Sequence, residues 1–216
     1  MVFVYKENTI FFFYPIFAGK VPKSMRNLLL IFVIGCVLST RGSAQCTYVL
    51  NEYDAFDSTQ IVSVEPMSIG YLVPSAYTDE NGDIKMVEEA KLMFSYTEND
   101  SISSFFLTIA TLERNYYQIE AGRQISLMLN NGHVIPLLNV PDRGRFDEGT
   151  NMRMYNHVCV IPLDVFYSLT VFAIEKIRIN YKGYKRTLRL TREQQVALQD
   201  VIRCVGRGAE MYPIRP

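Results

Sequence analysis

Alternation of apolar and polar residues recurs along residues 45–216 and constrains the fold of this chain more than any other feature. Residues 91–96 and 176–181 place apolar side chains at every second position, and residues 184–190 do so apart from Arg186. A period of two is that of a β-strand with one buried face. Residues 105–110 are apolar on both faces, which predicts a central strand. Five further segments have the composition of strands: 47–52, 60–64, 125–130, 133–139 and 154–161.

One of these strand pairs carries a clear turn signal. Asn131-Gly132 predicts a hairpin with a type I′ turn, because both residue types accept a positive φ. Pro136 lies in the second strand of this hairpin and cannot donate a ladder hydrogen bond. We therefore expect that strand at a sheet edge or at a bulge.

The last element is predicted to be a helix. Thr191 and Gln194 form a capping-box pattern ahead of an apolar stripe with helical spacing, and Gly206 is the expected C-cap. Together the elements predict one mainly β domain, an antiparallel sandwich or partly open barrel of about eight or nine strands with one C-terminal helix. Some criteria would class this arrangement as α+β.

The start of the chain has the pattern of an export signal. Arg26 precedes an apolar run over residues 28–38, and small or polar residues follow up to Ala44. This order is that of a secretory signal peptide, and the run is shorter than the roughly 20 residues that span a bilayer. We therefore expect a secreted or periplasmic protein. The chain then divides into a non-native upstream extension over 1–24, a signal peptide over 25–44 and a single β-rich domain over 45–216.

A lipoprotein signal is the alternative interpretation of this leader. Residues 33–36 fit a bacterial lipobox, in which Cys36 would carry a lipid and anchor the protein. The apolar run, however, continues through Val37 and Leu38, where lipoproteins usually turn polar. A cleaved signal peptide is therefore the preferred interpretation.

Export permits disulfide bonds, and residues 45–216 contain Cys46, Cys159 and Cys204. Three cysteines allow three pairings, each of which leaves one cysteine over. We favour Cys46–Cys204, because Cys46 opens the domain and Cys204 lies near the end of its last helix. A bond there would restrain both termini. Cys159 lies in an apolar strand and is interpreted as a small buried hydrophobe.

Charge is distributed unevenly along the chain. The whole sequence has 22 basic and 22 acidic residues, and this zero balance argues against a globally basic nucleic-acid-binding protein. Within residues 45–216, however, 17 basic and 21 acidic side chains leave a net charge of −4. Residues 176–192 carry seven basic side chains and no acid, so the rest of the domain has a net charge of −11.

This basic C-terminal hairpin is the candidate binding surface. Its members are Lys176, Arg178, Lys182, Lys185, Arg186 and Arg189. A basic strand pair on an acidic body fits an anionic partner, namely an anionic glycan, a lipid headgroup or an acidic protein surface. The alternatives are protection of a sheet edge by Lys and Arg, and neutralisation of the protein's own acidic side chains.

Other candidate sites carry weaker patterns. His157 and Cys159 share a strand face, but same-face neighbours point in parallel and no glycine-rich elbow accompanies them, which argues against a nucleophile–base pair. Residues 79–83 begin like a calcium loop, yet Ile84 and Ala90 occupy the positions that need Gly and a carboxylate. The sequence thus predicts no catalytic residue, no metal site and no cofactor.

Five segments follow one another in a recognisable order: Ala44-Gln45-Cys46, residues 51–57, residues 129–135, residues 174–179 and a closing helix with Cys204. This order resembles small secreted β-rich proteins of unknown function from Bacteroidota over most of residues 45–206. The resemblance implies an exported β-rich domain and the Cys46–Cys204 pairing. It brings no catalytic residue, and it does not account for residues 67–90.

These observations predict an exported, non-catalytic binding or interaction module that acts through its basic C-terminal hairpin. Two other functions stay open. An envelope-polymer hydrolase would draw its carboxylates from distant strands, and a structural component of a surface assembly would present an unpaired edge strand.

Overall fold

The computed structural model describes residues 3–6, 9–12, 46–99 and 102–212. The chain divides into two units, Met1–Gln45 and Cys46–Pro216. In the first unit, β1 (Phe3–Lys6) and β2 (Thr9–Phe12) form an antiparallel hairpin. The predicted signal peptide, including Cys36, lies outside the described residues.

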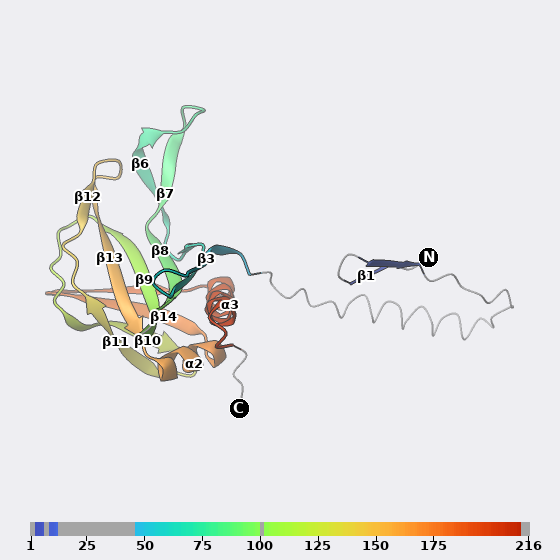
Figure 1. The fold of residues 1–216 in the computed structure, drawn as a ribbon. Coiled ribbons are helices and arrows are strands. Elements are labelled where there is room, and N and C mark those ends of the chain that lie inside the picture. The colour runs from blue at the N-terminus through green and yellow to red at the C-terminus, as the bar shows by residue number, and fades with distance from the viewer. Residues whose placement is uncertain (1–2, 7–8, 13–45, 100–101, 213–216) are drawn as a thin grey trace, which may run out of the picture. The chain divides into compact units, whose positions relative to one another are not determined.

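One antiparallel sheet dominates the second unit (Figure 1). Its main path, in the part of the chain that the structure describes, runs in the spatial order β15 (Tyr184–Arg189), β14 (Ile174–Tyr181), β10 (Gly122–Leu129), β11 (Val134–Val140), β13 (Met152–Ile161), β9 (Ser103–Glu113), β8 (Ala90–Glu98), β4 (Thr59–Val64) and β3 (Tyr48–Asp54). Two short strands, β5 (Met67–Ser68) and β12 (Arg145–Asp147), pair with β8 and β13.

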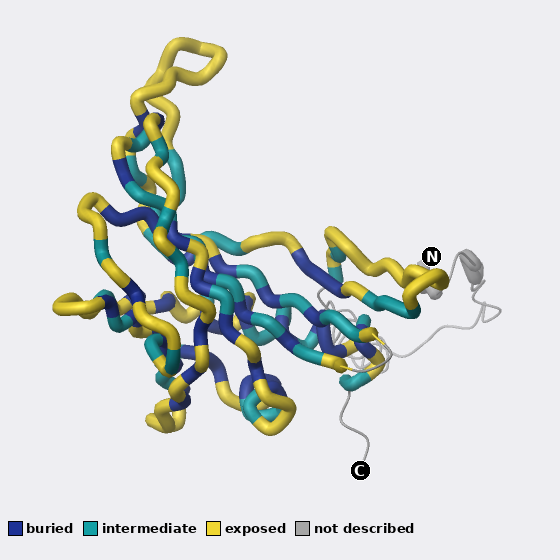
Figure 2. The backbone as a smooth tube through the Cα atoms, turned by 60° about the vertical axis from the view of Figure 1, so that its left-hand side comes forward, coloured by how far each residue is buried: buried dark blue, intermediate teal, exposed yellow. Residues whose placement is uncertain are grey.

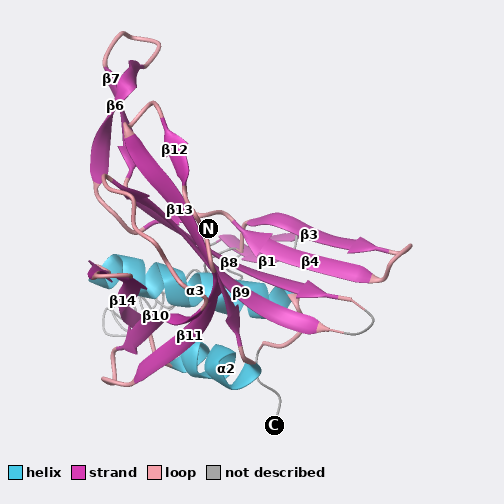
Figure 3. Ribbon diagram, turned by 90° about the vertical axis from the view of Figure 1, so that its left-hand side faces the viewer, coloured by secondary structure: helices cyan, strands magenta, loops and turns pink. Residues whose placement is uncertain are grey.

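Two helices complete the second unit. α2 (Leu163–Val171) follows β13, and α3 (Arg192–Gly208) follows β15. α3 contacts β14 near one end of the sheet path and β4 and β8 near the other, and it also contacts α2 (Figure 3). β15 and β3 remain end strands, so the sheet does not close into a barrel. The predicted fold class, a mainly β antiparallel domain with a C-terminal helix, is confirmed.

The core lies between the inner face of the sheet and the two helices. Phe94 of β8, Phe105 of β9 and Phe166 of α2 are buried and stack on one another, and the ring centroids of Phe105 and Phe166 lie 4.0 Å apart. Such aromatic pairs add roughly 0.5–1.5 kcal/mol each beyond the area they bury. The alternating pattern that predicted the strands therefore also fixes which face packs against the helices.

The favoured disulfide between Cys46 and Cys204 is confirmed. The two Cα atoms lie 5.5 Å apart, within the usual range for a disulfide. Next to the bond, the hydroxyl of Tyr48 donates a hydrogen bond of 3.0 Å to the carbonyl oxygen of Cys204. Cys46 lies two residues before β3 and Cys204 lies in α3, so the bond ties the edge of the sheet to the helix.

Of the two locations predicted from Pro136, the sheet edge is wrong, because β11 lies between β10 and β13. The register of β10 and β11 does shift, as at a bulge, between Leu137 and Asn139. β11 pairs with β10 from Val134 to Asn139, but its pairing with β13 is limited to Asn139 and Val140. Pro136 therefore lies in a part of β11 that has no ladder partner on the β13 side. An interior strand can tolerate the missing N–H of proline there.

The hairpin around Gly132 is confirmed, but its turn is not type I′. Gly132 has a φ of 84°, whereas Asn131 is not among the residues with positive φ. The N–H of Gly132 donates to the carbonyl of Leu129, and the N–H of Leu129 donates to the carbonyl of His133, each at 2.9 Å. The loop thus contains residues 130–132, with glycine in the left-handed position that a three-residue loop requires.

α3 begins as predicted and ends later. The N–H of Gln194 donates to the hydroxyl of Thr191, and the N–H of Thr191 donates to the side-chain oxygen of Gln194, so the capping box is confirmed. The expected end at Gly206 is wrong, because the helix continues to Gly208. A Cβ at Gly206 would lie 2.6 Å from the ring of Phe166. Glycine at this position allows close packing of α3 on α2.

Residues 67–90, which the resemblance does not account for, contain β5 and a hairpin outside the main sheet. β6 (Leu72–Thr78) and β7 (Ile84–Glu88) make a separate hairpin that projects from the main sheet (Figures 1 and 3). It is exposed along most of its length (Figure 2). In the middle of β6, the hydroxyl of Ser75 donates a 3.1 Å hydrogen bond to the carbonyl of Gly149. This contact fixes the hairpin to the turn before β13.

Candidate functional site

Four of the six predicted cations lie on the outer face of β14 and β15. Lys176 and Arg189 are partners in the register of the two strands. Arg178 and Lys185 lie an even number of residues from them, so all four side chains leave the same side of the sheet. We call Lys176, Arg178, Lys185 and Arg189 the basic face.

The basic face contributes little to the ion pairs of the fold. Lys176 lies 2.9 Å from the carboxylate of the adjacent Glu175, and a partly solvated pair of this kind is worth at most about 1 kcal/mol. Among the described residues, Arg178, Lys185 and Arg189 form no ion pair. These three guanidinium and ammonium groups are therefore available to an anion from outside.

Lys182, the fifth predicted cation, lies in the turn between β14 and β15. Its side chain is exposed and stands 4.0 Å from the carboxylate of Glu120. It lies beside the basic face and outside the alternation that defines it.

Arg186, the sixth predicted cation, points to the inner side of the sheet and does not join the basic face. Its guanidinium lies 2.5 Å from Glu89 and 2.8 Å from Glu113, and it also donates a 2.8 Å hydrogen bond to the carbonyl of Leu112. Only 10% of its side chain is exposed. The interpretation of a cation that neutralises the protein's own acids therefore describes Arg186.

These contacts join the end strand β15 to β9 and to the residue that precedes β8. Burial by itself would lower the pKa of Arg186, but the hydrogen bond and negative charge of Glu113, together with the charge of Glu89, outweigh it and raise the pKa. The guanidinium is thus held charged between two carboxylates. Removing one member of such a buried cluster leaves an uncompensated charge.

A second buried polar cluster lies beside Arg186. His157 of β13 is fully buried, and its Nε2 lies 3.0 Å from the hydroxyl of Tyr181. The same hydroxyl donates to Glu113 at 3.1 Å and lies 3.3 Å from the hydroxyl of Thr111. Desolvation lowers the pKa of His157 to about 4, so the imidazole is neutral at pH 7. His157 acts here as a polar group inside the core.

The predicted interpretation of Cys159 as a buried hydrophobe is confirmed. The residue is a free cysteine with no exposed surface, and desolvation raises the pKa of its thiol to about 12. A thiol in that state is a poor nucleophile. No contact joins its sulfur to His157 among the hydrogen bonds of the described residues.

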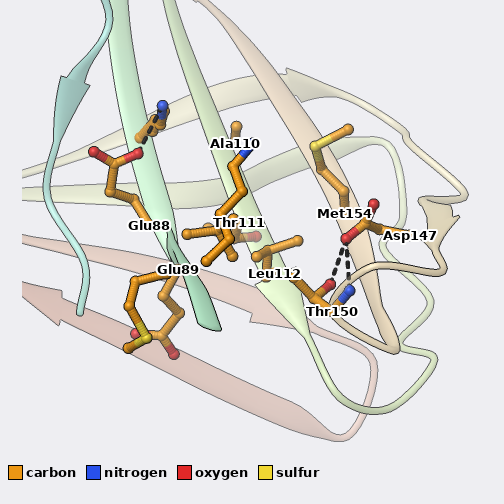
Figure 4. A pocket seen from close by; sticks show the side chains of 12 residues that line it. Glu88, Glu89, Ala110, Thr111, Leu112, Asp147, Thr150 and Met154 are labelled. Atoms are coloured by element: carbon orange, nitrogen blue, oxygen red, sulfur yellow. Dashed lines mark hydrogen bonds and ion pairs between the residues drawn. The ribbon is translucent and has the colours of Figure 1, made fainter. Parts of the chain in front are cut away.

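A surface pocket of about 460 Å³ opens between β7, β8, β9 and β12, and three carboxylates lie in its wall (Figure 4). Glu88 forms an ion pair with Lys91 at 2.7 Å, and Glu89 binds the Arg186 cluster described above. Asp147 accepts a 2.6 Å hydrogen bond from the hydroxyl of Thr150. Each of the three carboxylates thus already has a partner within the protein.

The acidic turn at residues 79–83 is organised by one of its own side chains. The carboxylate of Asp79 accepts 2.9 Å hydrogen bonds from the N–H groups of Asn81 and Asp83. Among the described residues, no group of three or more His, Cys, Asp or Glu side chains is arranged to hold a metal ion.

The outer face of β11 carries an apolar stripe that was not predicted from the sequence. The exposed residues of this strand are Val134, Pro136, Leu138 and Val140, all of them apolar. Their inward neighbours are buried, so β11 is apolar on both sides. We call these four residues the outer stripe. The signal was present in the sequence, because residues 134–140 contain only one polar side chain, Asn139.

Comparison of the chain with protein family models, with curated proteins and with solved structures finds no match.

Proposed function

We propose that the second unit is an exported, non-catalytic binding module that recognises an anionic partner through the basic face. One observation carries this proposal. β14 and β15 present four cations on a single outer face, while the one inward cation of the same hairpin, Arg186, forms ion pairs with Glu89 and Glu113. The exposed cations are thus not needed to neutralise the carboxylates beneath them. Concentrated positive charge on an acidic body creates a local field that attracts anions.

An exported location forms part of this proposal. The leader pattern over residues 25–44 predicts secretion or delivery to the periplasm, and the disulfide between Cys46 and Cys204 is of the kind that persists in oxidising compartments. No helix among the described residues is long and apolar enough to cross a membrane.

The test is salt-dependent retention on heparin, a soluble polyanion. We expect the double variant Lys185→Glu/Arg189→Glu to elute at lower salt than the native protein. The control is Lys85→Glu/Arg114→Glu, which changes the net charge equally at exposed sites away from the basic face. Equal shifts in the two variants would show an effect of net charge alone, and no retention of the native protein would refute the proposal.

A second candidate function, assembly through a sheet edge, rests on β3. This strand ends the sheet path, and its exposed side chains include Val49, Leu50 and Tyr53. Unpaired edges of this kind can accept a strand from another chain. Glu52 and Asp54 on the same edge oppose pairing with a second copy. Analytical ultracentrifugation tests whether a second copy can pair there: a native monomer is expected if the acids prevent it, and a native dimer that Leu50→Lys dissociates would show that β3 accepts a second copy.

A further inference from the structure

The outer stripe is not required by the core of the domain. In antiparallel sheets with one solvated face, outward residues are usually polar. On β11, the inward side chains of Ile135 and Leu137 are buried and already supply the core contacts. The outward side chains of Val134, Leu138 and Val140 are 53%, 58% and 59% exposed. Contiguous exposed apolar surface of this kind marks an interaction site.

The neighbouring strand β13 widens the stripe. Val140 is paired in register with Val158, and Val160 on the same face is 43% exposed. Val160 in turn is paired with Phe106 of β9, which is half-buried. From Val134 to Val140 the stripe runs about 20 Å, six strand residues at about 3.4 Å each. The outer stripe and its neighbours on β13 therefore form an elongated apolar surface on the sheet.

The basic face lies next to the outer stripe on the same side of the sheet. Lys176 is paired with Met128 of β10, and Met128 is paired with Val134. Arg178 is likewise two strands away from Pro136 through β10. Two strand spacings correspond to about 10 Å. The outer surface thus changes from cations on β14 and β15 to aliphatic side chains on β11 and β13.

We propose that this combined surface docks on an anionic lipid bilayer, an inference that rests on the proposed function and names its partner. At the boundary between headgroups and acyl chains, aliphatic side chains are removed from contact with water, while adjacent cations contact lipid phosphates. A soluble anionic glycan would engage the cations and leave the outer stripe exposed. An acidic protein surface would offer little to cover Val134 and Leu138. Of the three partners, an anionic bilayer is the one that would contact both the basic face and the outer stripe.

The test is sedimentation of the protein with vesicles of phosphatidylcholine, with and without phosphatidylglycerol. We expect binding to the vesicles that contain phosphatidylglycerol, and weaker binding as salt is raised. The stripe variant Val134→Ser/Leu138→Ser should weaken that binding by about tenfold or more, since it removes apolar surface from the contact. The matched control Ile84→Ser/Met86→Ser alters two exposed apolar side chains of the β6–β7 hairpin and should bind as the native protein does.

Heparin retention of the same variants separates the two proposals. The stripe variant should keep the retention of the native protein, because the basic face is intact. If the native protein does not bind the anionic vesicles, or if the stripe variant binds them equally well, the lipid inference is overturned while a heparin effect of Lys185 and Arg189 upholds the proposed function. If the native protein is neither retained on heparin nor bound to the anionic vesicles, the proposed function and the lipid inference are both refuted. If the native protein is a dimer and the stripe variant is a monomer, a second copy covers the outer stripe and the inference is overturned.

Discussion

Acidification should destabilise this fold through His157. The imidazole is buried and neutral in the folded protein, with a pKa lowered from 6.5 to about 4 by desolvation. In the unfolded chain it is exposed and titrates near its ordinary value. The unfolded state therefore binds more protons between these two values, and stability rises with pH there and is lost as the pH falls through 6.5 towards 4. For this shift the loss between pH 7.5 and 4.5 is about 2.5 kcal/mol.

The assay is urea unfolding of the native protein and of His157→Gln at both pH values. The two proteins differ only at residue 157, so the contribution of every other group cancels when the two losses of unfolding free energy are compared. The native protein should lose about 2.5 kcal/mol more than the variant does, since glutamine binds no proton. His133→Gln is the matched control, because His133 is exposed after the turn of the β10–β11 hairpin and should leave the native pH dependence unchanged.

Equal losses of stability in the native protein and in His157→Gln would refute this reasoning. They would mean that the imidazole is solvated or charged in the folded state. The cluster of His157, Tyr181 and Thr111 would then have a different protonation from the one its burial dictates.

Three other predictions concern stability and reactivity. Replacing Cys46 and Cys204 by serine opens a cross-link over 158 residues and should lower the free energy of urea unfolding by about 5 kcal/mol in the chain-entropy model. Arg186→Met should cost about 3–5 kcal/mol in the same assay, because it leaves two carboxylates without their cation, whereas Lys185→Met should stay within about 0.5 kcal/mol. Cys159 should resist alkylation at pH 8 in the folded protein and react once urea unfolds it, as mass spectrometry of the labelled chain would show.

Much of the fold follows from local pattern. The alternation over residues 91–96 and 176–181 predicts strands, and the residues after Thr191 specify a helix start, because these signals depend only on near neighbours in the chain. The role of Gly206 could not be predicted from its near neighbours in the chain. Its requirement for a small side chain comes from Phe166, forty residues earlier in the sequence. The place of β11 in the sheet likewise depends on which strands lie beside it.

The candidate site shows the same division. Period two in residues 184–190 already places Arg186 with Leu188 and apart from Lys185, so its inward direction was present in the pattern. What the pattern lacked was the identity of the partners, since Glu89 and Glu113 come from distant segments. The outer stripe was hidden for a related reason, because a strand that is apolar on both sides does not reveal which side faces solvent.

The two interpretations of the basic hairpin hold at different residues, and this decides how its function can be tested. Arg186 neutralises buried carboxylates, so its substitution would change the fold and the surface together. Lys185 and Arg189 face outward without ion pairs among the described residues, so their reversal changes the surface alone. A loss of anion binding in Arg186 variants would say nothing about the basic face. The same loss in Lys185→Glu/Arg189→Glu, with unfolding free energy unchanged, would locate the binding surface on β15.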